Sequence, residues 1–289
     1  MTTTPDLDAP LARARTLLFV PGNRPERFMK ALASGADAVV LDLEDAVPAD
    51  AKVAAREAIA AAWQEVRRAG LPLVVRISAP ASEAGIADLA WLARLQPAPD
   101  AVMVPKADGV DALQAVVQAA PGVPLLPLIE SAAGWDALPV IASTPGVLRL
   151  VIGHIDFVAD TGLLCSDDER ELVPLRFAVA MHTRLQQLAP AIDGVTAAFD
   201  DDARLRADTQ RALRFGFGAK LCIHPRQVAV VHDALAPSAD ERAWAERVLA
   251  ADAASGGAAV QLDGRMVDLP VVLQARRTLA RSRPPEDRR

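Results

Sequence analysis

Two acidic residues follow apolar segments near the middle of the chain, and their chemistry sets the first hypothesis. Glu130 follows the apolar segment 125–129, and Asp156 follows the segment 148–152. Parallel strands that are buried on both faces read as continuous apolar runs, and the residues just beyond them lie at one edge of the sheet. Carboxylate oxygens are the ligands that Mg²⁺ prefers. The pattern therefore predicts a Mg²⁺ (or Mn²⁺) site formed by Glu130 and Asp156, with helix capping as the alternative for each acid.

Eight apolar runs, rich in β-branched residues, are the elements that would position these acids. Helical patterns separate most of the runs, which is the number and order of elements in a (β/α)8 barrel. We therefore predict an α/β fold, a TIM barrel over residues 14–237, after an N-terminal tail of residues 1–13. The predicted strands are Arg15–Val20, Ala38–Leu43, Pro72–Ile77, Ala101–Val104, Pro124–Ile129, Leu148–Ile152, Ile192–Thr196 and Ala219–Ile223.

The pattern changes after the eighth run. A helical stretch over 239–254 is followed by Ser255-Gly-Gly, a short segment over 260–270 and a second helix through Ala280. We predict a C-terminal helical appendix over residues 238–281, which packs on its own barrel or on a neighbouring one, and a flexible tail over 282–289. Within the barrel, the Ala-rich stretch 50–70 predicts an outer helix that Asp50 caps.

The other predicted strands also end in polar or ionisable residues. The loops that follow the strands of a TIM barrel build its active face. So many polar side chains at one edge favour a catalytic face over a set of independent helix caps. These residues are Asn23 and Arg24 with Lys30 on the next helix, Glu44, Asp45, Arg76, Lys106, Asp200 and His224.

Each of these residues has a functional and a structural interpretation. Arg76 can bind a carboxylate or stabilise an oxyanion, or it can pair with a neighbouring acid. Glu44 and Asp45 can orient metal-bound water, or they can cap the helix that follows. Lys106 can face an anionic ligand or form an ion pair. The histidines of the rim, His154 and His224, fit a structural role better than that of a base.

The loop Pro21-Gly-Asn-Arg24 offers backbone N–H groups and a cation, and Lys30 adds a second cation on the following helix. A phosphate could approach these groups. With a single glycine, the signal falls well short of a P-loop.

Composition excludes several classes of protein. The net charge is 31 − 37 = −6 and 52% of the 289 residues are hydrophobic, which disfavours disorder and nucleic-acid binding. Cys165 and Cys222 lack a CxxC spacing, which argues against zinc and for a reducing compartment. The N-terminal segment has no signal-peptide pattern, and no apolar run approaches the roughly 20 residues of a membrane helix. We therefore expect a cytoplasmic protein with no nucleic-acid or membrane partner.

Several segments together resemble a known family. They resemble the citrate lyase beta subunit and its relatives in the HpcH/HpaI-type aldolase superfamily, in order from about residue 14 to residue 278. The segment Gly264-Arg-Met-Val-Asp268-Leu-Pro also resembles the malyl-CoA and citramalyl-CoA lyases. The other matching segments are Thr16-Leu-Leu-Phe-Val-Pro-Gly-Asn-Arg-Pro-Glu-Arg-Phe, Gly35-Ala-Asp-Ala-Val-Val-Leu-Asp-Leu-Glu-Asp-Ala-Val, Val75-Arg-Ile, Val104-Pro-Lys, Leu128-Ile-Glu-Ser, Gly153-His-Ile-Asp-Phe and Cys222-Ile-His-Pro.

The resemblance implies a homotrimer or hexamer of barrels, with a divalent metal held by Glu130 and Asp156. Arg76 and Glu130 would bind the substrate, a thioester carried on coenzyme A or on an acyl-carrier subunit. Asp268 would enter a neighbouring subunit's site as acid or base, and Glu44 or Asp45 remains a candidate base that acts through water.

The expected reaction is Mg²⁺-dependent, reversible Claisen-type cleavage of a 3-hydroxyacyl thioester of the citryl-, malyl- or citramalyl-CoA type. Its products are an acetyl or related thioester and a 2-oxo acid. Three alternatives stay open: a class II pyruvate-type aldolase, a malyl-CoA thioesterase, and a non-catalytic subunit of a lyase complex that only binds acyl-CoA or an acyl carrier.

Overall fold

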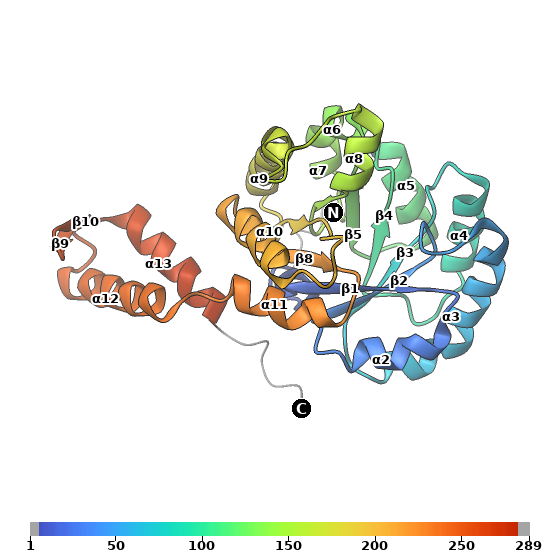
Figure 1. The fold of residues 1–289 in the computed structure, drawn as a ribbon, viewed down its shortest axis with the longest axis horizontal. Helices are drawn as coiled ribbons and strands as arrows, with labels where there is room; N and C mark the ends of the chain where they lie inside the picture. The colour runs from blue at the N-terminus through green and yellow to red at the C-terminus, as the bar shows by residue number, and fades with distance from the viewer. Residues whose placement is uncertain (1–5, 283–289) are drawn as a thin grey trace. The chain divides into compact units, whose positions relative to one another are not determined.

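Eight parallel strands close into a barrel in the computed structural model, which describes residues 6–282. Each strand pairs with the next along the chain, and the eighth pairs with the first, with Thr16 opposite Lys220. Figure 1 shows the strands surrounded by helices, and the closed order of the eight strands confirms the predicted TIM barrel. The strands are β1 (Thr16–Pro21), β2 (Ala38–Asp42), β3 (Leu73–Arg76), β4 (Ala101–Val104), β5 (Leu125–Ile129), β6 (Val151–Ile152), β7 (Ile192–Asp193) and β8 (Ala219–Cys222).

The helices of the barrel follow its strands in sequence. Three 3₁₀ turns lie among them, namely η1 (Pro25–Arg27), η2 (Ala49–Ala51) and η3 (Arg170–Leu172). The α-helices that follow β1 are α2 (Phe28–Leu32), α3 (Lys52–Arg67), α4 (Glu83–Leu92), α5 (Val110–Ala119), α6 (Ala132–Asp136), α7 (Leu138–Ala142), α8 (His154–Thr161), α9 (Val173–Leu185), α10 (Asp202–Arg214) and α11 (Arg226–Leu235).

The interior of the barrel is filled by alternate residues of the strands. All eight strands contribute to one apolar cluster, including Val40, Val74, Leu126 and Leu128. Because side chains alternate between the two faces of a strand, the next inward positions along these rows are Asp42, Arg76 and Glu130. The inward rows therefore change from apolar to charged at the carboxyl rim, the edge of the barrel where strands β1–β8 end.

Part of the expected N-terminal tail is ordered. Helix α1 (Pro10–Arg13) precedes β1, and its Leu11 and Ala12 are buried in the apolar cluster of the barrel. The fully buried Arg149 binds this segment, because its guanidinium donates to the carbonyl oxygens of Leu11 at 3.1 Å and Ala14 at 2.6 Å. The segment thus belongs to the barrel, a role that its short sequence does not reveal.

Helix α3 packs a regular apolar face on the barrel, with Ile59 and Trp63 four residues apart and both buried. The prediction that Asp50 caps this helix is wrong. Asp50 lies inside the turn η2, and α3 begins at Lys52 without a side-chain cap. The chain leaves the helix through Gly70, whose φ of +71° lies in the left-handed region, as expected from the sequence.

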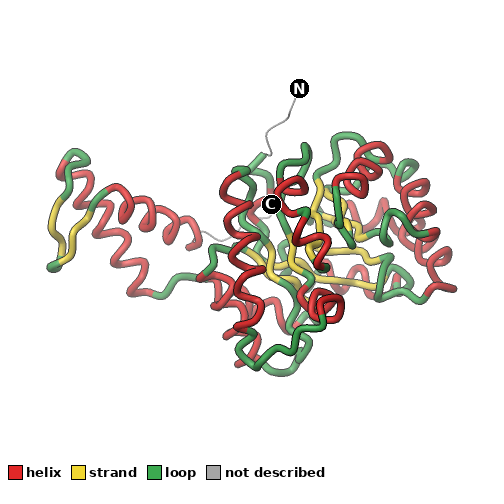
Figure 2. Tube along the Cα trace, turned by 90° about the horizontal axis from the view of Figure 1, so that it is seen from above, coloured by secondary structure: helices red, strands yellow, loops and turns green. Residues whose placement is uncertain are grey.

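The chain divides into two compact units, one up to Val231 and one from His232. The second unit contains α12 (Ala239–Ser255) and α13 (Leu269–Ser282), which are joined by the hairpin of β9 (Val260–Leu262) and β10 (Arg265–Val267). These two helices lie side by side in Figure 2 and share a core that includes Val248 and Val272. The predicted appendix is therefore a small helical unit with its own core. Most of the expected tail lies outside the described residues.

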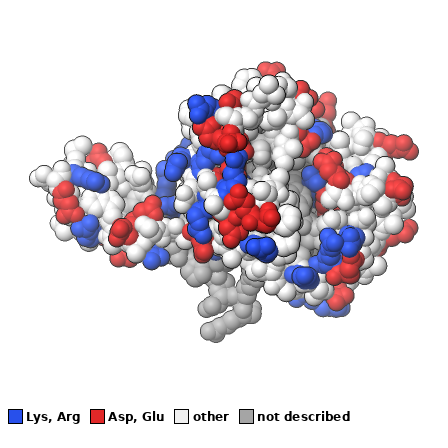
Figure 3. Space-filling model, viewed as in Figure 1, with Lys and Arg blue, Asp and Glu red and all other residues white. Residues whose placement is uncertain are grey.

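Charged side chains of both signs alternate over the face drawn in Figure 3, in keeping with the small net charge of −6. Within residues 6–282, none of the helices combines the length and apolar composition that crossing a lipid bilayer requires.

Candidate active site

Glu130 lies directly after β5 and is buried at the carboxyl rim. Its Oε1 accepts a hydrogen bond from the backbone N–H of Lys106 at 2.8 Å and lies 3.4 Å from Lys106 Nζ. The helix that follows, α6, is capped by Ser131, whose hydroxyl oxygen accepts from the Gly134 N–H at 2.9 Å. Glu130 is therefore not the cap of this helix, so its carboxylate is available to bind a ligand at the carboxyl rim.

Asp156 is the third residue of α8, directly after β6, and its side chain is half-buried. It does not cap this helix, because Gly153 occupies the N-cap position. Asp156 Oδ1 lies 3.0 Å from Lys106 Nζ. The Lys106 ammonium group thus lies between the two predicted metal ligands, and the structure brings Glu130 and Asp156 together around a cation. Of the two roles predicted for Lys106, this structure shows the ion pair, which it forms with Glu130 and Asp156.

The electrostatics of this pair favour a bound cation. Burial, together with the charge of Asp156, raises the pKa of Glu130 to about 7, although Lys106 acts to lower it. Burial opposes the charged form of Lys106, but the charges of Glu130 and Asp156 outweigh it and raise the pKa of its amine. A neighbouring carboxylate disfavours the charged form of an acid, and a nearby cation favours it.

The donor set fits a magnesium ion. The described residues contain no cluster of three or more His, Cys, Asp or Glu side chains that could hold a metal. Mg²⁺ commonly takes one or two protein carboxylates and fills its remaining positions with water and substrate oxygens. Glu130 and Asp156 match that arrangement, so they are the residues that would hold the ion.

Gly153, which the sequence analysis did not single out, lies against Glu130. A Cβ atom on Gly153 would lie 2.6 Å from Glu130 Oε2 and 2.7 Å from Glu130 Cβ. Only glycine lets the start of α8 approach the acid so closely. The sequence signal was a glycine placed between the strand β6 and Asp156.

Arg76, at the end of β3, is held by two acids from β2 and the loop after it. Its Nε and one terminal nitrogen donate to the two carboxylate oxygens of Asp42 at 2.7 and 2.6 Å, and the other terminal nitrogen lies 2.7 Å from Glu44 Oε2. The guanidinium lies over the ring of Phe19, 4.6 Å from its centroid. A guanidinium has five N–H groups, so the two hydrogen bonds to Asp42 leave N–H groups on the terminal nitrogens for a ligand.

Sequence reasoning missed Asp42, although a signal was present. Asp42 and Glu44 are two residues apart and therefore project on the same side of an extended chain. Asp42 is fully buried, and a buried acid inside a strand needs a cationic partner. That partner is Arg76, and the pair fixes the orientation of its guanidinium.

Glu44 is buried beside Arg76, whereas Asp45 is exposed. Burial raises the pKa of Glu44 to about 8; Arg76 lowers it, and Glu130, Asp45 and Asp42 raise it further. The effect of Glu130 shows that the acids of β2 and β5 belong to one electrostatic site. Asp45 Oδ2 lies 4.0 Å from the Arg76 guanidinium and its side chain is 65% exposed, so it lies at the margin of this site.

The loop after β1 lies against the end of β2. The Gly22 N–H donates to the Asp42 carbonyl oxygen at 2.7 Å, and a Cβ at Gly22 would lie 2.8 Å from that oxygen. Asn23 Oδ1 is buried and has no hydrogen-bond partner among the described residues. Arg24 pairs with Glu26 at 2.6 Å on the surface, and Lys30 is exposed on α2. Asn23 is thus more buried than either cation.

Two further predicted residues have local structural contacts. His224 stacks on Phe199 with ring centroids 5.2 Å apart, and its Nδ1 accepts from the Arg226 N–H at 3.2 Å. Asp268 belongs to the second unit, where its Oδ1 accepts from the Val271 N–H at 3.4 Å at the start of α13.

Comparison with known proteins gives concordant results. Residues 15–225 match the family model described as HpcH/HpaI aldolase/citrate lyase. A citrate lyase subunit beta-like protein of Deinococcus radiodurans is 36% identical over 286 residues, which cover 95% of this chain and 99% of that protein. A (3S)-malyl-CoA thioesterase of Cereibacter sphaeroides is 31% identical over 271 residues, or 93% and 94% of the two chains.

A solved structure has the same architecture. It is the protein CitE from Mycobacterium tuberculosis in complex with magnesium, acetoacetate and coenzyme A. It superposes with a TM-score of 0.81 at 33% sequence identity and covers 94% of this chain and 99% of that one. The likeness therefore includes the barrel and extends over nearly the whole chain.

Proposed function

The chain belongs to the HpcH/HpaI aldolase/citrate lyase family, and from this premise we propose that it is a Mg²⁺-dependent carbon–carbon lyase acting on a 3-hydroxyacyl thioester. The products would be an acetyl or related thioester and a 2-oxo acid, and the reaction would be a reversible Claisen-type cleavage. The observation that carries the proposal is the pair Glu130 and Asp156, which both lie against the Lys106 ammonium group. The guanidinium of Arg76, fixed by Asp42, lies on the same rim.

The metal would be held by Glu130 and Asp156. An ion bound by these two residues would supply Lewis acidity at the carbonyl that forms as the carbon–carbon bond breaks. The related CitE protein binds magnesium together with acetoacetate and coenzyme A, which supports the same pairing of metal and thioester carrier here. Lys106 has a long, flexible side chain, and it would turn from the two acids toward a carboxylate of the substrate.

Arg76 would bind the substrate and stabilise negative charge on its oxygen. Because Asp42 holds two of its nitrogens, the guanidinium does not have to reorganise when charge develops, which is the condition for effective electrostatic stabilisation. Glu44, with a pKa of about 8, is poised to exchange a proton near neutral pH, directly or through water. Asp45 is the more exposed alternative for this role.

Cleavage also requires a proton for the carbon of the departing enolate. We assign this step to Asp268 of a neighbouring copy in a homotrimer or hexamer. The support is the segment 264–270, which resembles the lyases of free coenzyme A esters. The thioester itself would be carried on coenzyme A or on an acyl-carrier subunit of a lyase complex. Asn23, Arg24 and Lys30 beside β1 would face the phosphate of either carrier.

One assay tests the reaction class. The purified chain with Mg²⁺ is given citryl-, malyl- and citramalyl-CoA and, in a separate reaction, a free hydroxy-oxo acid, and the 2-oxo acid and the free thiol are measured separately. A 2-oxo acid without free thiol identifies the lyase. Free thiol with release of the hydroxy acid identifies a thioesterase, which the 31% identical malyl-CoA thioesterase makes the second candidate. Cleavage of free hydroxy-oxo acids would identify the class II aldolase, and binding without turnover would identify a non-catalytic subunit.

Two variants test the metal site. Glu130→Gln and Asp156→Asn should each lower Mg²⁺-dependent turnover by more than about 100-fold, since each removes one of two ligands from the ion. Asp111→Asn, at an exposed acid in the first turn of α5, is the matched control and should behave as wild type. Wild-type turnover in either ligand variant would show that the metal site is misplaced.

A further inference from the structure

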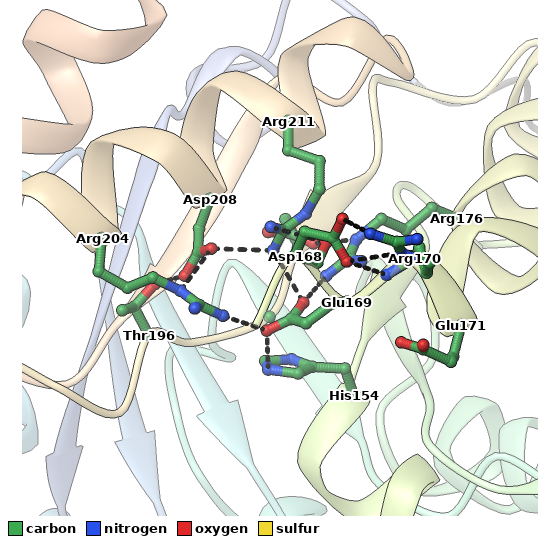
Figure 4. Close-up of polar contacts among 12 residues, drawn as sticks. His154, Asp168, Glu169, Arg170, Glu171, Arg176, Thr196, Arg204, Asp208 and Arg211 are labelled. Carbon is green, nitrogen blue, oxygen red and sulfur yellow. Dashed lines mark hydrogen bonds and ion pairs between the residues drawn. The ribbon is translucent and has the colours of Figure 1, made fainter. Parts of the chain in front are cut away.

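A cluster of charged residues near the start of α8, the helix that carries Asp156, has no part in the proposed chemistry. Its centre is Glu169, in the loop between α8 and α9, and its other members are Arg176 of α9 and Arg204 and Arg211 of α10; we name these four residues the clasp (Figure 4). Glu169 Oε2 lies 2.6 Å from Arg176 and 2.8 Å from Arg211, and Oε1 lies 3.1 Å from Arg204. One loop carboxylate thus binds guanidinium groups from two helices.

The arginines are fixed independently of Glu169. Arg204 and Arg211 lie 3.0 and 2.9 Å from Asp208 of the same helix. Arg176 Nε lies 3.4 Å from the buried Asp193 of β7, which in turn lies 2.9 Å from Lys220 of β8. The three arginines are therefore anchored to the barrel and to α10, and through Glu169 they hold the loop between α8 and α9 in place.

The backbone of Glu169 agrees with this assignment. Its φ of +50° and ψ of +37° are left-handed, a conformation that is unfavourable for a residue with a side chain and that persists only where the surroundings enforce it. The side chain is 13% exposed, and burial alone would raise its pKa. Arg176 and Arg211 reverse that effect and lower the pKa, so the carboxylate is charged.

The clasp reaches the metal-ligand pair through His154, the first residue of α8. His154 Nε2 lies 3.9 Å from Glu169 Oε1. On its other side, a Cβ atom on Gly194 would lie 2.3 Å from His154 Nδ1, so the ring is confined between the Gly194 backbone and Glu169. Two residues further along the same helical turn is Asp156. Two contacts therefore position the first turn of α8. Gly153 packs against Glu130 at its start, and His154 packs against Glu169 of the clasp on its side.

We propose that Glu169 is a positioning residue: by closing the loop 162–172 onto α10 it confines His154 and so fixes Asp156 relative to Glu130. The inference rests on the proposed function, because it takes Glu130 and Asp156 as the metal ligands. Glu169 touches neither the ion nor the substrate in this scheme. It acts through the first turn of α8.

The test measures metal binding apart from catalysis. Mn²⁺ is titrated into the metal-free full-length protein and followed by electron paramagnetic resonance or calorimetry, for wild type and Glu169→Gln. Outer partners of metal ligands typically contribute about 10-fold or more to affinity, and we expect a loss of that size. The KM for Mg²⁺ should rise by a larger factor than kcat falls, because the ligands remain and only their spacing changes.

The chain supplies a matched control and a second variant. Asp168→Asn alters the neighbouring residue of the same loop, whose pair with Arg170 at 2.7 Å lies in solvent with both side chains more than half exposed, and it should change Mn²⁺ affinity less than about twofold. Arg204→Gln opens the clasp from the helix side at a partly exposed position, and it should reproduce the loss if Glu169→Gln does not fold.

The outcomes separate the two proposals. If wild type binds no Mn²⁺, the proposed metal site fails, and the role of Glu169 fails with it. If wild type binds Mn²⁺ and Glu169→Gln binds it equally well, even with a lower melting temperature, then Glu169 is only structural and the positioning role is refuted while the metal site stands.

Discussion

Replacing Gly153 with alanine tests the geometry of the acid pair most directly. The added Cβ would lie 2.6 Å from Glu130 Oε2, 2.7 Å from Glu130 Cβ and 3.3 Å from Leu128 Cγ. Carbon atoms pack at about 3.5 Å or more, so Glu130 and the first turn of α8 must separate by about 0.8 Å. Binding constellations tolerate displacements of only about 0.5 Å.

Two quantities follow from this displacement. Overpacking of this kind costs roughly 1–3 kcal/mol of folding stability, which a protein of this size can absorb. The affinity for Mn²⁺ should fall by about 10-fold or more, because the two carboxylates no longer share one ion at their original spacing. The variant should thus remain folded while its metal site weakens.

The assay is a Mn²⁺ titration of the metal-free protein, with circular dichroism to confirm the fold. Gly109→Ala is the matched control: Gly109 has an extended φ of 175°, and a Cβ there would meet nothing within 4 Å. Its Mn²⁺ affinity should equal that of wild type. A Gly153→Ala protein that is folded and binds Mn²⁺ as tightly as wild type would refute the argument that this glycine sets the spacing of the ligands.

Three further predictions concern the rest of the barrel and the second unit. Lys220→Met leaves the fully buried Asp193 with Arg176 as its remaining cationic partner, and should cost about 3 kcal/mol, seen as a lower melting temperature; an unchanged melting temperature would contradict the importance of this pair. The folded-state pKa of Glu44, about 8, exceeds its unfolded value, so its stabilising contribution is complete below that unfolded value and is lost as the pH rises through 8. Metal-free wild type should therefore unfold at a lower urea concentration at pH 8.5 than at pH 5.5, and this difference should be smaller in Glu44→Gln. The same difference in wild type and variant would count against the raised pKa of Glu44. Finally, inactive Asp268→Ala and Arg76→Ala chains should recover activity when mixed into one oligomer, and no recovery after confirmed mixing would argue against a shared site.

The sequence by itself determined the architecture and the main acids of the rim. Parallel strands buried on both faces must be continuous apolar runs, so the eight runs appeared at the right places, and β2, β4, β7 and β8 begin at the predicted residues. Because such strands all end at one rim, the positions of Glu130, Asp156 and Arg76 also followed from the order of the runs. Short elements escaped this reasoning: α1 has too few residues to show a period, and the turn η2 displaced the expected cap of α3.

The tertiary structure decided which side chains hold one another. Arg76 meets Asp42 across 34 positions in sequence, and Lys106 meets Asp156 across 50, so no local pattern contains either pair. The sequence left open whether Glu130 caps the following helix or binds a ligand at the rim, and the structure shows that Ser131 is the cap. The closeness of Gly153 to Glu130, and the capture of Glu169 by arginines from two helices, depend on side-chain directions and on packing at distances below 3 Å. Those are properties of the folded chain. A sequence specifies which groups are present, but only the three-dimensional arrangement specifies which of them lie in contact.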